Sequence, residues 1–216
     1  MESRFCSANK TGTSRDTNGD MDETTFCGLG LATRPGLVMM PRPASEQLVT
    51  TVVDRLGHRP AVVADVGTGS GAIAVAIAAS ARHARVWATD TSPHAVLLAR
   101  ANAHRHRLGD RVTMRGGDLL DAVPGSLDVV VANLPYLPLA DAAFHADLAG
   151  EPVAAVFAPG DGLEHYRRLI EAAYERLLPK GALVIQLHRR VHVAERTELE
   201  QFAAELTPSL AAAASF

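Results

Sequence analysis

Short apolar runs alternate with helical segments along most of this chain, and this alternation limits the fold more than any other feature. Buried strands are predicted at residues 61–66, 85–90, 111–115, 127–132 and 182–187. Helices are predicted at 45–56, 72–81, 94–107, 163–178 and 194–206. Strands that alternate with helices of about 10–15 residues form a parallel sheet covered on both faces. We therefore expect a doubly wound α/β sheet with strand order 3-2-1-4-5.

Composition narrows the class of protein further. The 216 residues suit one domain, and 47% hydrophobic with 21% charged residues is ordinary for a globular chain. A net charge of −3 argues against binding nucleic acid by bulk charge. No apolar stretch approaches the ~20 residues of a membrane-spanning helix, and no secretory signal is recognisable, so we expect no membrane partner and a cytoplasmic protein. Neither Cys6 nor Cys27 has metal-ligand spacing, so no metal site is expected.

The chain divides into three parts by composition. Residues 1–25 are rich in Ser, Thr, Asn and Asp and are predicted to be a disordered leader. Residues 26–207 hold the predicted domain, and 208–216 form an alanine-rich tail. Within the domain, two short extended pieces are expected at 26–31 and 36–40, around a turn at Arg34-Pro35-Gly36.

A glycine-rich segment joins the first predicted strand to the helix that follows it. Glycines allow a sharp turn and a close approach by a ligand, and the helix N-terminus behind them suits an anion. Asp90 ends the second strand, where a carboxylate can accept both ribose hydroxyls of a nucleoside. We expect this crevice to bind a nucleoside-type cofactor, with contacts from Asp65, Gly67, Thr68, Gly69, Ser70, Gly71 and Asp90.

The identity of that cofactor depends on the residues around the glycines. Gly67, Gly69 and Ala72 also satisfy the relaxed dinucleotide fingerprint, so NAD stays an alternative. Asp65 favours S-adenosylmethionine, because a carboxylate suits its ammonium group but not the pyrophosphate of NAD. After the third strand, Asp118 could meet the exocyclic amine of adenine, or it could be a simple turn aspartate.

The segment Asn133-Leu134-Pro135-Tyr136 follows the fourth strand, at the sheet edge where ligands bind in doubly wound folds. It resembles the (N/D)-x-P-(Y/F) motif of amino-methyltransferases. The Asn133 side-chain oxygen and the Leu134 carbonyl would grip the N–H groups of a planar amide or amine, and Tyr136 would lie against it. Such positioning aims the nitrogen at a methyl group without a strong base.

Together these motifs resemble the protein-glutamine N5-methyltransferases that act on peptide-chain release factors. The resemblance covers about residues 26–202 and includes two further segments, Pro-Arg-Pro-Ala-Ser-Glu at 41–46 and Glu-Pro…Gly-Asp-Gly-Leu-Glu-His-Tyr-Arg from 151 to 167. It implies a Rossmann-like class I S-adenosylmethionine-dependent methyltransferase fold and a release factor as protein substrate. It also implies cofactor contacts at Asp118 and Leu119, and a glutamine side chain held at Asn133, Leu134, Pro135 and Tyr136.

Three departures from that family stand out. Leu134 replaces the first proline of the usual Asn-Pro-Pro-Tyr, as in the similar motif of rRNA adenine dimethylases. Fewer than about forty residues precede the Pro-Arg-Pro segment, without a helical pattern; relatives lacking the N-terminal helical lobe work with a small partner protein. The C-terminal antiparallel hairpin of the family is expected to be missing, which would leave 182–187 as an apolar edge strand. Such an edge predicts a covering partner, self-association or a chain of low stability.

Alternative functions follow from the same residues. The first is an RNA adenine N6-methyltransferase, and the second is an NAD(P)-binding oxidoreductase. The third is a degenerate module that binds S-adenosylmethionine without turnover. A basic run at Arg100, His104, Arg105, His106, Arg107 and Arg111 is interpreted as a solvated face, with an RNA-binding patch as the alternative.

Overall fold

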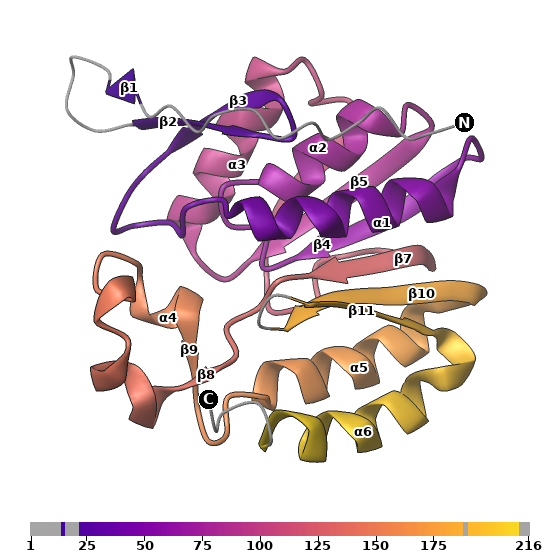
Figure 1. The fold of residues 1–216 in the computed structure, drawn as a ribbon. Coiled ribbons are helices and arrows are strands. Elements are labelled where there is room, and N and C mark those ends of the chain that lie inside the picture. The colour runs from indigo at the N-terminus through magenta and orange to yellow at the C-terminus, as the bar shows by residue number, and fades with distance from the viewer. Residues whose placement is uncertain (1–13, 16–21, 188–189, 212–216) are drawn as a thin grey trace.

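A computed structural model describes residues 14–15, 22–187 and 190–211. Its centre is a six-stranded sheet in the order β11-β10-β7-β4-β5-β6 (Figure 1). The parallel strands are β4 (Ala61–Val66), β5 (Ala84–Asp90), β6 (Val112–Gly116), β7 (Leu127–Ala132) and β10 (Leu177–Leu187). The predicted order 3-2-1-4-5 is confirmed.

Helices cover both faces of this sheet (Figure 1). α1 (Glu46–Leu56), α2 (Ala72–Ser80) and α3 (Pro93–Arg105) pack on one face, and α5 (Glu164–Arg176) and α6 (Leu199–Ala211) lie on the other. Alternate strand residues feed the two hydrophobic clusters. Val129 and Val131 belong to the first cluster, whereas Val130 and Ala132 belong to the second, as the period of two in a strand requires.

The outer edge of β10 is paired within the chain, which corrects the prediction of a missing hairpin. β11 (Arg190–Glu195) runs antiparallel to β10, with Leu187 opposite Arg190 and Ala182 opposite Glu195. The predicted last helix is present, but its predicted start at about Ala194 was wrong, because β11 continues to Glu195 and the helix begins at Leu199. The β11 sequence carries charged, exposed ends typical of an edge strand, and its pairing with β10 overrides the weak local pattern. The reason for expecting a covering partner is thereby removed.

An N-terminal hairpin precedes the sheet. β2 (Asp22–Phe26) and β3 (Leu29–Thr33) are antiparallel, and Cys27 and Gly28 form the turn with φ of 48° and 75°. Positive φ at both turn residues is the two-residue hairpin geometry. The expected strand at 36–40 is absent from this described part of the chain, so that prediction was wrong.

The predicted leader and tail fall partly outside the described residues. Residues 1–13 and 16–21 of the leader lie outside them, whereas β1 (Ser14–Arg15) pairs with β2. Of the tail, 212–216 lie outside the described residues, and α6 continues to Ala211.

The sequence predicted no helix or strand in the long connection between β7 and α5. It contains β8 (Leu137–Pro138), which pairs in parallel with β9 (Phe157–Ala158). Between them lie η2 (Leu139–Phe144), η3 (Ala146–Leu148) and α4 (Val153–Val156). Two short 3-10 turns, η1 (Pro43–Ser45) and η4 (Arg196–Glu198), lead into α1 and α6.

Candidate functional site

A cavity of about 330 Å³ lies where β4, β5 and β7 end. This volume is within the range of small-molecule sites. The cavity brings together residues that are far apart in the sequence, and the predicted site residues on its wall are Gly67, Gly69, Asp90, Asp118, Leu119, Asn133, Leu134 and Pro135. Four further predicted cofactor residues, Asp65, Thr68, Ser70 and Gly71, and the predicted substrate residue Tyr136 are not among its lining residues.

The glycine loop (residues 65–71) owes its shape to left-handed backbone at its glycines. Gly67 has φ +69° and Gly71 has φ +80°, conformations that other residues rarely adopt. A Cβ at Gly71 would lie 3.0 Å from the Ala99 backbone, so the loop packs directly on α3. A Cβ at Gly67 would lie 2.6 Å from the Leu134 side chain. Gly67 is therefore where this loop contacts the second predicted motif.

Asp90 holds the glycine loop against β5 as well as lining the cavity. Its Oδ2 accepts a hydrogen bond from the Gly69 amide at 2.9 Å, and its Oδ1 accepts one from the Ser92 amide at 2.9 Å. A carboxylate offers about four lone-pair sites, so both oxygens keep capacity for a ligand hydroxyl.

Asp65 lies beneath the loop and is fully buried. Its Oδ2 accepts hydrogen bonds from the Thr68 hydroxyl at 2.6 Å and the Ala74 amide at 3.1 Å, which fixes the start of α2. Its Oδ1 is buried with no hydrogen-bond partner among the described residues. Burial raises the pKa of Asp65 to about 7, against the lowering effect of the Thr68 bond. Thr68 and Ser70 are themselves buried, so their side chains support the loop.

Asp118 and Leu119 follow β6 and line the same cavity. Asp118 pairs with Arg168 of α5. Leu119 has a positive φ of 46°, and its carbonyl accepts a hydrogen bond from the Thr89 hydroxyl at 2.7 Å. This turn is thus tied both to α5 and to β5, more than a simple surface turn requires.

The amide bend (residues 133–136) is held by side chains from two distant elements, η1 and α5. Asn133 Nδ2 donates to Ser45 Oγ at 3.0 Å, and the Leu134 amide donates to the Tyr166 hydroxyl at 3.0 Å. The Tyr166 oxygen also lies 2.9 Å from the Leu134 carbonyl and 2.7 Å from the Gln186 carbonyl. Burial holds the pKa of Tyr166 well above its usual value, so its proton stays in place for these contacts.

Gly162 fixes the far end of the bend. It has φ +88°, and a Cβ there would lie 2.2 Å from the Tyr136 carbonyl oxygen. Only glycine fits such an approach. The Tyr136 side chain packs against the hydrophobic cluster beside α5.

A partly exposed ion pair connects two segments that line the cavity. Arg42 pairs with Glu151 at 2.8 Å, and the other Glu151 oxygen accepts a hydrogen bond from the Met40 amide at 3.1 Å. Residues 37–39 and Pro152 beside this pair line the cavity. Sequence reasoning gave no site role to Ser45, Tyr166, Gln186, Glu151 or the cavity-lining His165. For Ser45, Glu151, His165 and Tyr166 the signal was their place in the two further family-like segments; Gln186 had none.

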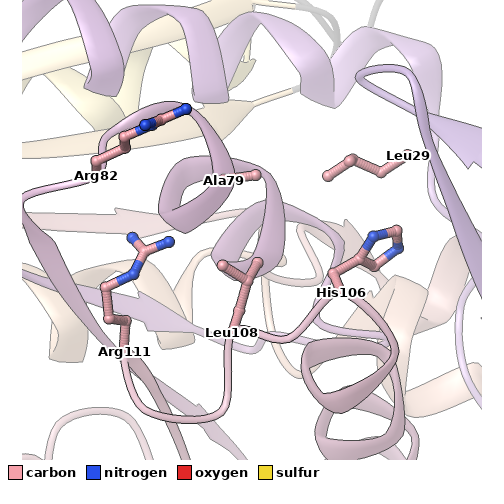
Figure 2. Close-up of a pocket in the computed structure, with 6 residues that line it drawn as sticks. All are labelled: Leu29, Ala79, Arg82, His106, Leu108 and Arg111. Carbon is pink, nitrogen blue, oxygen red and sulfur yellow. The ribbon is translucent and has the colours of Figure 1, made fainter.

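A second cavity, of about 410 Å³, lies between the N-terminal hairpin and the ends of α2 and α3. Figure 2 shows Arg82 and Arg111 at one side of it and Leu29 and His106 at the other. Its polar groups serve the fold: Arg111 donates to the Ala78 carbonyl at 2.5 Å, and His106 Nε2 lies 2.8 Å from the Gly30 carbonyl. None of the predicted site residues lines it.

Most residues of the basic run also make contacts that serve the fold. Besides Arg111 and His106, Arg100 donates to the Met114 carbonyl and Arg105 pairs with Glu23. These contacts join α3 to the sheet and to the hairpin.

No group of three or more His, Cys, Asp or Glu side chains in the described ranges could hold a metal ion. Within the same ranges, no helix has the length and apolar character to cross a membrane.

The fold and the cavity define a Rossmann-like protein of the class I S-adenosylmethionine-dependent methyltransferase type. Residues 42–150 match the Methyltransferase small domain family, and the chain belongs to that family. The crystal structure of ribosomal protein L11 methylase from Lactobacillus delbrueckii subsp. bulgaricus superposes with a TM-score of 0.50 at 27% identity, over 70% of this chain and 63% of that one.

Curated relatives support the resemblance found in the sequence. The release factor glutamine methyltransferase of Geobacter sulfurreducens is 41% identical over 165 residues, which are 75% of this chain and 57% of the relative. That of Bordetella pertussis is 43% identical over 162 residues, 73% of this chain and 59% of the relative. The chain thus spans less than two thirds of the length of these relatives.

Proposed function

We propose that this chain transfers a methyl group from S-adenosylmethionine to the side-chain amide nitrogen of a glutamine in a peptide-chain release factor. The observation that carries the proposal is the shared cavity, in which the glycine loop and the amide bend face the same space. The names of the curated relatives support the choice of acceptor. A release factor as substrate also favours the cytoplasm, where translation ends.

The residues of the cavity fit S-adenosylmethionine. Gly67 and Gly69 leave room for a close approach, Asp90 offers acceptors for ribose hydroxyls, and Asp118 with Leu119 borders the place for adenine. Asp65 lies outside the cavity lining, and its role would be to hold the glycine loop in place through Thr68 and Ala74. When bound, this cofactor supplies an electrophilic methyl carbon on a positively charged sulfur.

The amide bend would position the acceptor. Asn133 Oδ1 would accept one N–H of the glutamine amide and the Leu134 carbonyl the other. Both oxygens would stabilise the positive charge that develops on the nitrogen. Because the Leu134 peptide is fixed by Tyr166, this carbonyl is already oriented before an acceptor binds.

Leu134 favours one alternative acceptor. The Asn-Leu-Pro-Tyr sequence resembles that of rRNA adenine dimethylases, so the exocyclic amine of adenine in RNA is the second candidate. An NAD(P)-dependent oxidoreductase and a binding module without turnover are further outcomes that the experiment below distinguishes.

The test is a methyl-transfer assay with labelled S-adenosylmethionine. Purified release factor and bulk RNA are offered side by side, and mass spectrometry locates the modified residue. The control is a release factor whose Gly-Gly-Gln glutamine is replaced by alanine. Label on that glutamine supports the proposal. Label on RNA supports the second candidate, and cofactor binding without transfer to either supports a module without turnover. Titration with NAD(P) tests the remaining alternative.

A further inference from the structure

A chain of two buried hydrogen bonds ends at Asn133. Ser45 Oγ donates to Gln186 Oε1 at 2.8 Å, and Asn133 Nδ2 donates to Ser45 Oγ at 3.0 Å. Ser45 and Gln186 are only 4% and 3% exposed. Their positions are 88 and 53 residues from Asn133 in the sequence. Two buried polar side chains are thus arranged in a hydrogen-bonded chain that ends at one residue of the amide bend.

The direction of these bonds decides which way the Asn133 amide faces. A serine hydroxyl has one proton. Because that proton goes to Gln186 Oε1, Ser45 Oγ can only accept from Asn133, and it must meet the NH₂ end of the amide. The Asn133 oxygen is therefore turned away from Ser45. If the hydroxyl instead donated to Asn133, the amide would flip and offer N–H groups where an acceptor oxygen is needed.

Ser45 makes no local side-chain hydrogen bond to the helix that follows it. It is the last residue of η1 and runs into α1 with helical φ −81° and ψ −9°, not with the extended backbone of a serine N-cap. Its side chain accepts no hydrogen bond from the first turn of α1. The hydroxyl is therefore available for the contacts with Gln186 and Asn133.

We infer that Ser45 and Gln186 act as positioning residues, which fix the Asn133 amide with its oxygen toward the acceptor nitrogen. This inference rests on the proposed function for its kinetic consequence. The orientation itself belongs to the protein without ligands, so it can be measured separately.

The kinetic test compares variants that remove or keep each hydrogen-bonding group. Ser45→Ala should lower kcat by about tenfold or more, as expected when a buried polar partner is lost, while the affinity for S-adenosylmethionine stays within about twofold. Ser45→Thr keeps the hydroxyl and should retain most of the rate. Gln186→Met removes the acceptor at similar volume and should resemble Ser45→Ala, whereas Gln186→Glu keeps an acceptor and should not.

Thr51→Ala is the matched control, because it removes a hydroxyl from α1, the helix that directly follows Ser45. The Thr51 hydroxyl donates to the Gln47 carbonyl at an exposed position, remote in function from the bend. It should leave both kcat and cofactor affinity unchanged.

The second measurement needs no methyl transfer. In the wild-type protein, NMR should show Asn133 side-chain amide protons that are protected from exchange with water, with their signals assigned by loss in Asn133→Ala. Ser45→Ala should abolish that protection and Ser45→Thr should keep it.

The outcomes separate the inference from the proposed function. Protected Asn133 protons without methyl transfer to any acceptor would refute the proposed function and leave the orientation in place. Full kcat in Ser45→Ala, failure of Ser45→Thr to retain activity, or unprotected protons in the wild type would overturn the inference.

Discussion

The two loops that meet in the cavity are built in opposite ways. The glycine loop is shaped by its own sequence: left-handed glycines at 67, 69 and 71, and a carboxylate at Asp65 that bonds to Thr68 three residues on. The amide bend contains neither a glycine nor a described side-chain hydrogen bond within its own four residues. Ser45, Tyr166 and Gly162 hold it from 88, 32 and 26 residues away in the sequence.

This difference predicts that the two loops affect different properties, cofactor affinity for one and turnover for the other. A loop with locally encoded shape can be recognised from sequence and can survive changes elsewhere in the chain. A bend held by distant side chains depends on the packing of α1, α5 and β10 around it. We therefore expect substitutions in the glycine loop to alter cofactor affinity, and substitutions around the bend to alter turnover.

The largest expected effect is that of Asn133→Ala on turnover. Loss of one oriented polar group at a reacting centre typically costs about 10²–10³ in kcat. Binding of S-adenosylmethionine, measured by calorimetry, should stay within about twofold of the wild type. A variant that keeps its full rate would show that the bend does not grip the acceptor.

Gly162→Ala should have the next largest effect, and that effect should be a loss of stability of the fold. A left-handed alanine costs roughly 1–2 kcal/mol, and the clash with the Tyr136 carbonyl adds about 1–3 kcal/mol. Chemical denaturation measures the free energy of unfolding. Gly160→Ala is the control, since Gly160 has φ +62° but open space around its Cβ position. An equal loss of unfolding free energy in the two variants would mean that the close contact with Tyr136 does not contribute to the effect.

Asp90→Ala should weaken the binding of S-adenosylmethionine by about 1–3 kcal/mol, because it removes charged acceptors and releases the Gly69 amide. Isothermal titration measures the change, and turnover at saturating cofactor should fall less than the affinity does. Asp161→Ala removes a carboxylate that pairs with Arg167 and does not line the cavity, so its affinity should match the wild type. An unchanged affinity in Asp90→Ala would place the nucleoside elsewhere.

The last expected effect concerns neither cofactor binding nor turnover: Asp65 makes the stability of the fold depend on pH. Burial raises its pKa from 3.8 to about 7 on folding, so between these values the folded chain holds a proton that the unfolded chain has lost. Stability from this group therefore falls as the pH rises from about 4 to about 7. Between pH 5 and pH 8 this amounts to roughly 2–3 kcal/mol, so relative to Asp65→Asn the wild-type melting temperature should drop by about 5–10 °C, at about 2–4 °C per kcal/mol. A constant difference between the two proteins over that range would refute the raised pKa.

The outer edge of the sheet shows where sequence reasoning failed and why. In β11, Val191 and Val193 alternate with polar residues for only a few positions, too briefly to distinguish a strand from the start of a helix. This segment becomes a strand because its backbone pairs with the backbone N–H and C=O groups along β10, residues 177–187. The same limit explains why β8 and β9, with two residues each, were not predicted.

Local patterns by themselves determined the parallel core, the glycine loop and the position of Asn133 at the end of β7, because side-chain periodicity and the backbone freedom of glycine act over a few residues. Only the tertiary structure decided that Ser45, Gln186 and Tyr166 surround the bend, that Asp65 lies beneath the cavity, and that β11 closes the sheet. These features depend on contacts between segments many residues apart, and no short pattern of residues encodes which distant group will become a hydrogen-bond partner.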